Sequence, residues 1–378
     1  MNRLDYYLAI NHGYTHAVIL GIPILILGLA DNINETTNLI SWFSIGGIMY
    51  GFGAIPSGWL ATKNAYATLN GGLLLIIIGL LLAGVLDEKY IGPAFVIIGT
   101  GLSAYHPTGM AILAEIYPEN IGKALARNGV GGNIGQAAGP VIAGTWVFLE
   151  PENVFLIFAI LGVLTMASGI GTVPSLTKSK AGDLKSILAL FTTAIILLQI
   201  TNVLSGLAFR GVVVMSPDEI DFFLQTTPEE AAKVSAIMIS LASIAGIFGN
   251  LAVSNVIDKR GPPYVMFITS LFVLIGVILF SMALTEKIPG GLSLIALSMI
   301  IFGMATYGFQ PASNTYLARQ TEVGGRAALY GVTFALRFGL SFGAPLMIVL
   351  LKDVEATIIM IGFASLALIA SIAIARMR

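Results

Sequence analysis

The stretch YHPTGMAILAE at residues 105–115 recurs in the second half of the chain as FQPASNTYLAR at residues 309–319, with the proline and the last alanine in register. Two shorter matching stretches follow them, GKA at residues 122–124 and GRA at residues 325–327. Each longer stretch closes a long apolar run. The chain therefore consists of two halves with the same order of segments.

The composition indicates that these apolar runs lie in a lipid bilayer. Apolar residues make up 56% of the 378 residues, charged residues make up 10%, and the mean hydropathy is +0.90, which is far from the values of soluble domains. The 43 glycines fit close helix packing in lipid, where small residues let backbones approach. The sequence predicts an all-α integral membrane protein.

A helix that crosses a bilayer needs about 20 apolar residues, and windows of that length predict twelve transmembrane helices. The expected spans are 6–29, 39–60, 67–86, 91–115, 124–148, 153–173, 188–214, 234–257, 264–284, 292–318, 328–351 and 356–373. The basic connection PSLTKSKAGDLKS separates the sixth span from the seventh. We therefore expect two six-helix lobes, 1–173 and 188–378, joined by a linker at 174–187. Parallel repeats of this kind are typical of secondary transporters.

Lys and Arg indicate the orientation, because they are held back on the cytoplasmic side of a membrane. Most of the 19 Lys and Arg residues fall in segments on the same side as the N-terminus. With an even number of spans, both termini and the linker are expected in the cytoplasm, in a multi-pass protein of the plasma membrane. No small-residue cleavage site follows the first apolar run, which predicts a retained helix rather than a signal peptide.

Three motifs carry a resemblance to a known family. DKRG at residues 258–261 resembles the loop signature of that family. In the equivalent loop of the first half, Thr62 and Ala65 stand where the signature has Asp and Gly. GGNIGQAAGPVIAG at residues 131–144 is similar to the fifth-helix signature of proton-coupled antiporters. With YHP in the fourth helix, these motifs resemble the major facilitator superfamily, in particular its proton-coupled drug-efflux and fosmidomycin-resistance-like branch. The resemblance implies two lobes related by pseudo-two-fold symmetry around a central cavity, and proton-coupled export by alternating access.

Small residues recur every four positions on one face of the fifth helix and one face of the eleventh. The residues of this helix-packing motif, with the proline that we expect to bend the fifth helix, are Gly131, Gly135, Gly139, Pro140 and Gly144, then Gly339 and Gly343. We interpret the two faces as seams on which the lobes move, with partners in the eighth and second helices. Tight packing alone is the alternative for any single glycine.

The chain has three histidines, and all lie in apolar runs. His12 and His16 are four residues apart and share a helix face, about 9 and 15 Å into a core of about 30 Å. His106 lies in the fourth helix. If all three face one water-filled space, they are candidates for a proton pathway. The alternative is that each is neutral and satisfied by one hydrogen bond inside the bundle, with Tyr14, Asn11 or a carbonyl as the partner.

Arg337 is a charged residue that the sequence places about 14 Å into the eleventh helix, close to the midplane. A guanidinium there needs a partner or water, and no Asp or Glu is expected at the same depth. The substrate is then its counter-charge, which favours an anionic solute. Alternatively, carbonyls and Gln310 or Asn314 of the tenth helix hold the guanidinium. Asn133 of the fifth helix completes the substrate and proton pathway that we predict.

Charged residues near the cytoplasmic face are expected to form a gating network. Glu115 and Arg319 are repeat equivalents of opposite sign. We predict that Glu115 pairs with Lys63 in one lobe and that Asp258 pairs with Arg319 in the other. Arg127 lies one turn before the glycine face of the fifth helix. It is an alternative partner for Asp258, in a pair that would hold the cytoplasmic side shut.

Enzyme motifs and phosphate-binding loops are absent, so we expect a transporter without a cofactor and not an enzyme. HGYTH, with His106, has metal-ligand spacing, which leaves a divalent metal cation transporter or a metal-dependent intramembrane enzyme as the alternative. The missing carboxylates argue against both, and we predict no metal site. The expected partners are a small-molecule substrate, protons and the lipid bilayer. We expect a monomer that binds no nucleic acid.

Overall fold

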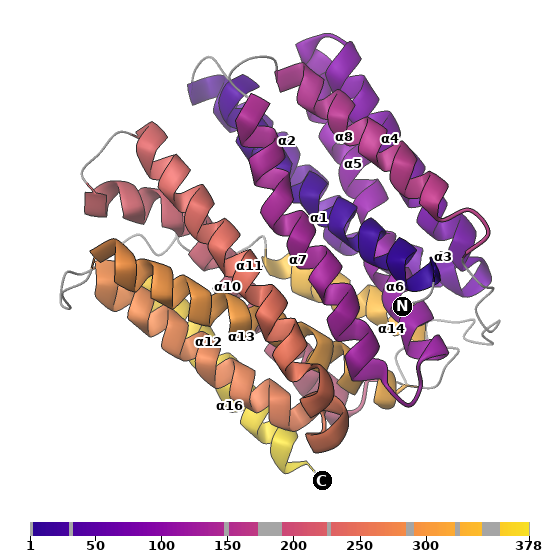
Figure 1. Ribbon diagram of the computed structural model, residues 1–378, viewed down its shortest axis with the longest axis vertical. Helices are drawn as coiled ribbons and strands as arrows, with labels where there is room; N and C mark the ends of the chain where they lie inside the picture. Colours follow the sequence, from indigo (N-terminus) through magenta and orange to yellow (C-terminus); the bar gives the residue numbers. More distant parts are fainter. Residues whose placement is uncertain are drawn as a thin grey trace. The chain divides into compact units, whose positions relative to one another are not determined.

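The computed structural model describes residues 3–29, 33–146, 151–172, 191–224, 228–284, 291–321, 326–341 and 356–377. Within these ranges the chain is helical and contains no β-strand (Figure 1). The predicted all-α fold is confirmed. The apolar runs form helices because a backbone in lipid must satisfy its hydrogen bonds within the segment.

Where the structure describes them, the twelve expected spans coincide with one helix or with two consecutive helices, and the eleventh span is described only as far as residue 341. The elements are α1 (Arg3–Leu29), α2 (Ile33–Phe52), α3 (Ala54–Lys63), α4 (Ala65–Val85), the short 3₁₀ helix η1 (Glu88–Tyr90), α5 (Ile91–Leu102), α6 (Tyr105–Ile116), α7 (Ile121–Trp146), α8 (Pro151–Ser168), α10 (Thr193–Leu224), α11 (Pro228–Arg260), α12 (Pro262–Leu284), α13 (Gly291–Arg319), α14 (Arg326–Phe334), the π-helix η3 (Ala335–Gly339) and α16 (Ala356–Arg376). Among the described residues, seven helices are long and apolar enough to cross a bilayer, and α2 with α3 makes an eighth if the bent pair is one span. The chain is a multi-pass membrane protein.

Two expected spans are each divided into two helices, and a proline follows each break. α2 and α3 meet at Gly53 with a bend of 40°, shortly before Pro56. α5 and α6 are separated by Ser103 and Ala104, shortly before Pro107. Proline has no amide N–H and crowds the carbonyl four residues earlier, so a helix is interrupted at that position. The sequence predicted both spans as continuous helices.

Contacts divide the chain into two compact units that do not follow the chain order. Unit 1 contains Met1–Glu119, Gly131–Leu190 and Ala318–Gly339, and unit 2 contains Asn120–Val130, Phe191–Leu317 and Leu340–Arg378. The start of α7 therefore groups with unit 2, whereas α14 and η3 group with unit 1. The lobes 1–173 and 188–378 stay predictions. The linker 174–187 lies outside the described residues.

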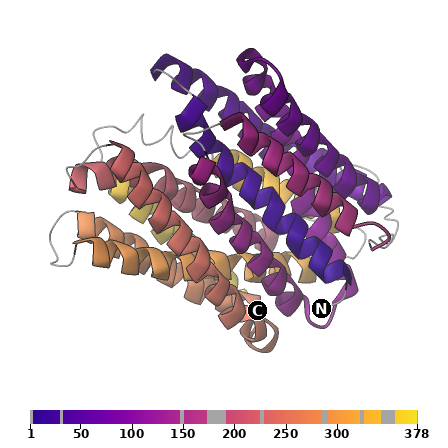
Figure 2. The ribbon, with the colours of Figure 1, turned by 45° about the horizontal axis from the view of Figure 1, so that its top comes forward.

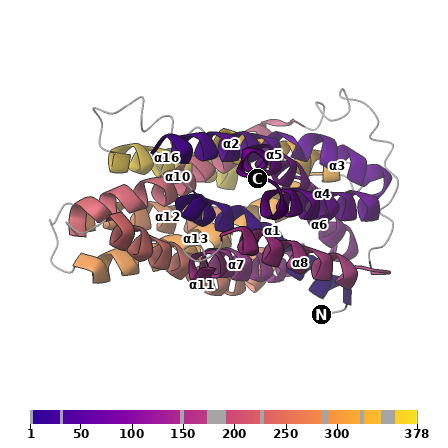
Figure 3. The same ribbon diagram turned by 90° about the horizontal axis from the view of Figure 1, so that it is seen from above.

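Large apolar side chains form the core of each unit. In unit 1, Phe95 of α5 and Phe155 and Phe158 of α8 are fully buried, and α4 packs against both helices. In unit 2, Phe280 of α12 and Met360 of α16 are buried, and α16 packs against α10 and α12 (Figure 3).

Asn64 caps the start of α4, because its Oδ1 accepts a hydrogen bond from the Ala67 N–H at 2.9 Å.

Candidate functional site

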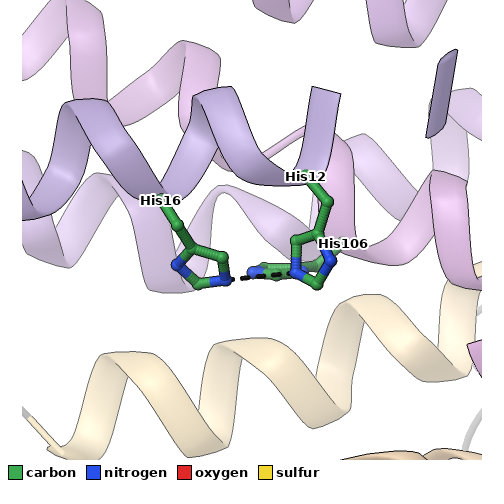
Figure 4. A group of neighbouring side chains, drawn as sticks. All are labelled: His12, His16 and His106. Carbon is green, nitrogen blue, oxygen red and sulfur yellow. Dashed lines mark hydrogen bonds between the residues drawn. The ribbon is translucent and has the colours of Figure 1, made fainter. Parts of the chain in front are cut away.

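His12, His16 and His106 come together in unit 1, and we call them the histidine triad. α1 contributes His12 and His16, and α6 contributes His106 (Figure 4). The ring centroids are 4.8 Å apart for His12 and His16, 5.1 Å for His12 and His106, and 5.2 Å for His16 and His106. Their residues are 4%, 8% and 3% exposed, in chain order. The triad is a buried and nearly equilateral group of imidazoles.

The break before Pro107 places His106 in the triad. His106 is the second residue of α6, so its side chain leaves the backbone where α5 ends and α6 begins. The Oγ atoms of Ser103 at this break and Ser57 of α3 lie 3.0 Å apart and share a hydrogen bond. The α5–α6 break is therefore joined to α3, immediately after the α2–α3 bend.

Aromatic side chains surround the triad. The Tyr105 ring stacks on His12 with centroids 5.0 Å apart, and its hydroxyl donates to a backbone carbonyl of α1 at 2.6 Å. Phe334 of α14 and Phe338 of η3 stack on His106 with centroids 4.7 and 5.2 Å apart. Sequence reasoning missed these rings, because an aromatic residue in an apolar run looks the same whether it packs against lipid, core or an imidazole.

Two members of the triad are hydrogen-bonded to each other. The Nε2 atoms of His12 and His16 lie 3.1 Å apart, and the tautomer decides which one donates (Figure 4). Among the described residues, neither ring nitrogen of His106 has a hydrogen-bond partner, although the residue is buried. A buried polar group without a partner costs free energy and calls for a bound proton, ion, water or solute. The triad offers nitrogens for such a species.

The glycine face of α7 packs against α1, which corrects the partner that the sequence suggested. Gly131, Gly135 and Gly139 lie backbone to backbone against Ala9, Gly13 and Ala17 of α1. The two helices run side by side (Figures 1 and 2). The partner of this face is therefore α1, and a seam between the lobes stays a prediction. It holds α7 close to the helix that carries two members of the triad.

Gly132 makes room for His12. A Cβ at this position would lie 2.6 Å from His12 Cε1 and 2.9 Å from each ring nitrogen. A side chain there would push the imidazole out of place. The sequence singled out the neighbours of Gly132 but not this residue. Asn133 follows it, is 2% exposed, and its Nδ2 has no hydrogen-bond partner among the described residues.

The other members of the helix-packing motif differ in their surroundings. A Cβ at Gly51 of α2 would lie 2.5 Å from the Cα of Gly339, so these two backbones are in close contact. Gly144 is open, since the nearest atom to a Cβ there is 3.9 Å away. Pro140 lies inside α7, which continues past it. Gly343 lies outside the described residues.

Arg337 lies on the π-helix η3, where the sequence predicted a regular α-helix. Hydrogen bonds in a π-helix span one residue more than those in an α-helix, and π-helical turns are common at functional sites. The residue is 4% exposed, and its Cζ lies 5.9 Å from the centroid of the Phe338 ring. The ring of Phe338, the next residue, stacks on His106 with centroids 5.2 Å apart. Phe338 therefore links Arg337 to the triad.

Tyr14 does not join the triad, contrary to expectation. It lies two residues from His12 on the other side of α1, and a Cβ at Gly162 of α8 would lie 2.9 Å from Tyr14 Cζ. Asn11 donates to the hydroxyl of Tyr7 at 3.3 Å. The hydroxyl of Tyr14 has no hydrogen-bond partner among the described residues, so it does not bond to a histidine. A hydrogen bond between Asn11 and a histidine stays a prediction.

Gln310 and Asn314 lie on α13 in unit 2. Asn314 is buried and Gln310 is half-buried. Their predicted contact with Arg337 stays a prediction.

Asp258 binds the start of α7 through the backbone. Its Oδ1 accepts from the N–H of Gly122 at 3.3 Å, and its Oδ2 accepts from the N–H of Lys123 at 3.1 Å. A carboxylate at a helix N-terminus satisfies N–H groups that lack a partner within the helix and interacts favourably with the helix dipole. Arg127 and Arg319 have exposed side chains, and their pairing with Asp258 stays a prediction.

Lys63 at the end of α3 lies over the Trp59 ring, with Nζ 3.5 Å from the ring centroid. This is a cation–π contact. Glu115 is half-buried near the end of α6. The predicted pair of Glu115 and Lys63 stays a prediction.

Arg326 is a residue that the sequence marked only as part of the GRA repeat. Its Nη1 donates to the carbonyl of Ala114 at 2.8 Å, and its Nε donates to the carbonyl of Ala318 at 3.2 Å. These carbonyls belong to the last turns of α6 and α13, where the helix dipole favours a cation. Arg326 therefore joins the ends of both helices to the start of α14.

Comparisons with known proteins agree with this architecture. The human organic anion transporter MFSD10 (TETRAN) superposes with a TM-score of 0.78 at 14% identity, over 98% of this chain and 99% of that chain. FucP in the outward conformation gives a TM-score of 0.73 at 15% identity, over 99% of both chains. A bacterial homologue of the iron transporter ferroportin, in its outward-facing state, gives 0.71 at 13% identity, over 99% of both chains. At such identities the likeness shows the fold alone.

The family is shown by a different comparison. A search of curated proteins found no match. The family model of the Major Facilitator Superfamily matches residues 15–345, which is most of the chain. Together with the helical architecture, this match confirms the predicted fold of twelve spans in two lobes and indicates a transporter rather than an enzyme. The chain belongs to the Major Facilitator Superfamily.

Proposed function

We propose that this protein exports a small organic anion in a proton-coupled cycle of alternating access. The observation that carries the proposal is the buried Arg337, which lies next to the Phe338 ring that stacks on His106 of the histidine triad. A permanent positive charge and a group of imidazoles, which can accept protons, are thereby linked through one aromatic ring. We further propose that the protein is a monomer of the plasma membrane, with both termini in the cytoplasm, and that it belongs to the drug-efflux and fosmidomycin-resistance-like branch.

Arg337 supports an acidic solute. A guanidinium binds a carboxylate or a phosphonate through two parallel hydrogen bonds, and a buried guanidinium gains more from such a partner than an exposed one does. The structural neighbour MFSD10 is named an organic anion transporter. That name agrees with the proposed substrate class, although only the fold is shared.

The triad supports proton coupling. Imidazole is the side chain that changes its charge between about pH 5 and pH 8. The ring centroids of the triad lie within 5.2 Å of one another. A second proton on the triad would therefore be repelled by the first. The triad is therefore suited to carry one proton at a time. Export is the direction that the resemblance to efflux proteins implies.

The substrate is sought first by binding. Purified protein is heated with a panel of acidic metabolites and antibiotics at two pH values, because a ligand that binds the native state raises its apparent stability. A solute that stabilises the parent protein is then tested in proteoliposomes. A pH-sensitive dye inside the vesicles reports whether protons move against the solute, as exchange requires, or with it.

The coupling residue is identified with His12→Gln, His16→Gln and His106→Gln. Loss of the responsible imidazole should abolish accumulation driven by a pH gradient but leave exchange of labelled for unlabelled solute at equal pH, since exchange needs no net proton movement. If all three variants still accumulate solute along a pH gradient, the triad does not carry the proton.

A further inference from the structure

We propose that the histidine triad binds one transition-metal ion of the zinc class. This site goes beyond the proposed function, in which the metal is neither the cargo nor required. It also reverses the expectation of no metal site. That expectation rested on the missing carboxylates, and zinc does not need carboxylates when three imidazoles are available.

The spacing of the ring nitrogens is close to that of a three-histidine site. One ligand atom from each of His12, His16 and His106 lies within 4.8 Å of the other two. Bonds of about 2.0–2.1 Å in a tetrahedral zinc site place neighbouring nitrogens roughly 3.3 Å apart. The Nε2 atoms of His12 and His16, at 3.1 Å, already have about that separation. A side-chain movement of about 1.5 Å closes the remaining distance.

The donor set selects the kind of metal. Within the described residues the group consists of imidazoles, without Asp or Glu, and the whole chain has no Cys. Imidazole suits Zn²⁺, Cu²⁺, Ni²⁺ and Fe²⁺, whereas Mg²⁺, Ca²⁺ and Mn²⁺ prefer carboxylate and carbonyl oxygens. Three neutral imidazoles leave the fourth tetrahedral position for water or an anion.

The surroundings hold the rings in place for binding. Tyr105 stacks on His12, and Phe334 and Phe338 stack on His106. Rings held by packing lose less conformational entropy when they coordinate an ion. Both nitrogens of His106 lack a hydrogen-bond partner among the described residues, so coordination through this ring displaces no protein hydrogen bond. Burial among aromatic rings also makes every polar interaction with the ion stronger.

Arg337 opposes the metal electrostatically. The guanidinium lies 5.9 Å from the centroid of the Phe338 ring, which stacks on His106, and a divalent cation at the triad would be repelled by it. An anion in the fourth coordination position would lie between two positive centres and offset this repulsion. We therefore expect zinc to bind more tightly when chloride or a carboxylate is present than in their absence.

The composition makes the experiment specific. The chain has three histidines, all in the triad, and no Cys, so a preparation without a polyhistidine tag contains no other imidazole or thiolate. Zinc binding is measured by isothermal titration calorimetry in detergent at pH 7.5 and pH 6.0, and Co²⁺ binding by visible absorption. We expect one zinc per chain, an intense tetrahedral Co²⁺ spectrum, and weaker binding at the lower pH because protons compete.

Variants locate the site. His12→Ala, His16→Ala and His106→Ala should each weaken zinc binding by at least about tenfold. Thr15→Val is the matched control. Thr15 is buried on the same helix, and its hydroxyl bonds to the backbone carbonyl of Asn11 rather than to the triad. A second measurement needs no variant, since zinc should shift the ring signals of all three residues in nitrogen-15 histidine-labelled parent protein.

Three results would overturn the proposal: no zinc binding up to about 1 mM, equal binding by the parent and the alanine variants, or histidine signals that zinc does not move. These measurements use no gradient and no solute. Loss of proton coupling in the transport assay therefore leaves the metal site standing. An absent metal site equally leaves the proposed transport function untouched.

Discussion

Gly132→Ala tests the histidine triad without altering a histidine. The new Cβ would lie 2.6 Å from His12 Cε1, whereas carbon atoms in contact are normally about 3.5–4.0 Å apart. The imidazole must then move by about 1 Å. A movement of this size is enough to lengthen or misalign the hydrogen bond between His12 and His16, whose Nε2 atoms lie 3.1 Å apart.

The fold should survive this substitution. Overpacking costs about 1–3 kcal/mol, and the cost at Gly132 falls at the lower end because the colliding atoms are the far end of a side chain. Alanine in a helix recovers about 1 kcal/mol relative to glycine. We therefore expect a net loss of about 0–2 kcal/mol in unfolding free energy. Transport driven by a pH gradient should fall with the displaced imidazole.

Nitrogen-15 NMR of histidine-labelled protein measures the displacement directly, because the chain contains three histidines. The signals of His12 and of its partner His16 should shift in Gly132→Ala. Gly144→Ala is the control on the same helix, since its Cβ would have no atom closer than 3.9 Å. If Gly132→Ala is folded and its three histidine spectra match those of the parent, Gly132 does not position His12 and the reasoning fails.

Three further predictions concern charged residues. Arg337→Lys keeps the positive charge but loses the planar guanidinium that forms two parallel hydrogen bonds, so the affinity for a carboxylate solute should fall by about tenfold or more in a binding titration. Unchanged affinity in this variant and in Arg337→Ala would show that Arg337 has a structural role only. Asp258→Asn removes a charge-assisted cap worth about 0.5–2 kcal/mol from the start of α7. A Cys placed at the buried Ile121 should then react faster with a thiol reagent. Equal labelling rates with and without the Asp258→Asn substitution would reject the capping role of Asp258. In Arg326→Lys the single amino group should not replace both guanidinium hydrogen bonds, to the carbonyls of Ala114 and Ala318, so the thermal midpoint of unfolding should fall as in Arg326→Ala. A midpoint equal to that of the parent would contradict the proposed role of Arg326 in joining α6 and α13 to α14.

Much of the fold could be predicted from the sequence, because it depends on properties local to each segment. A run of about 20 apolar residues with few charges forms a helix in lipid wherever its neighbours lie. The i, i+4 spacing places His12 and His16 on one face of α1 by helical geometry alone. The glycine period in the fifth span likewise predicts a face on which a backbone can approach closely. None of these inferences needs a knowledge of which helices are neighbours.

The composition of the site could not be predicted in this way, because it depends on which helix faces which. Periodicity identifies the glycine face of α7 but not its partner, and the partner is α1. Proline interrupts the helix before His106, whereas the repeat-equivalent Pro311 lies inside the continuous α13.

The same limit applies to the aromatic walls and to the turn at Arg337. Phe334 and Phe338 stack on His106 because α14 and η3 pack in unit 1, and the π-helical turn at Arg337 changes the direction that a regular helix would give its side chain. Packing and backbone irregularity are set by the sum of many weak contacts between distant segments, so only the tertiary structure decides them.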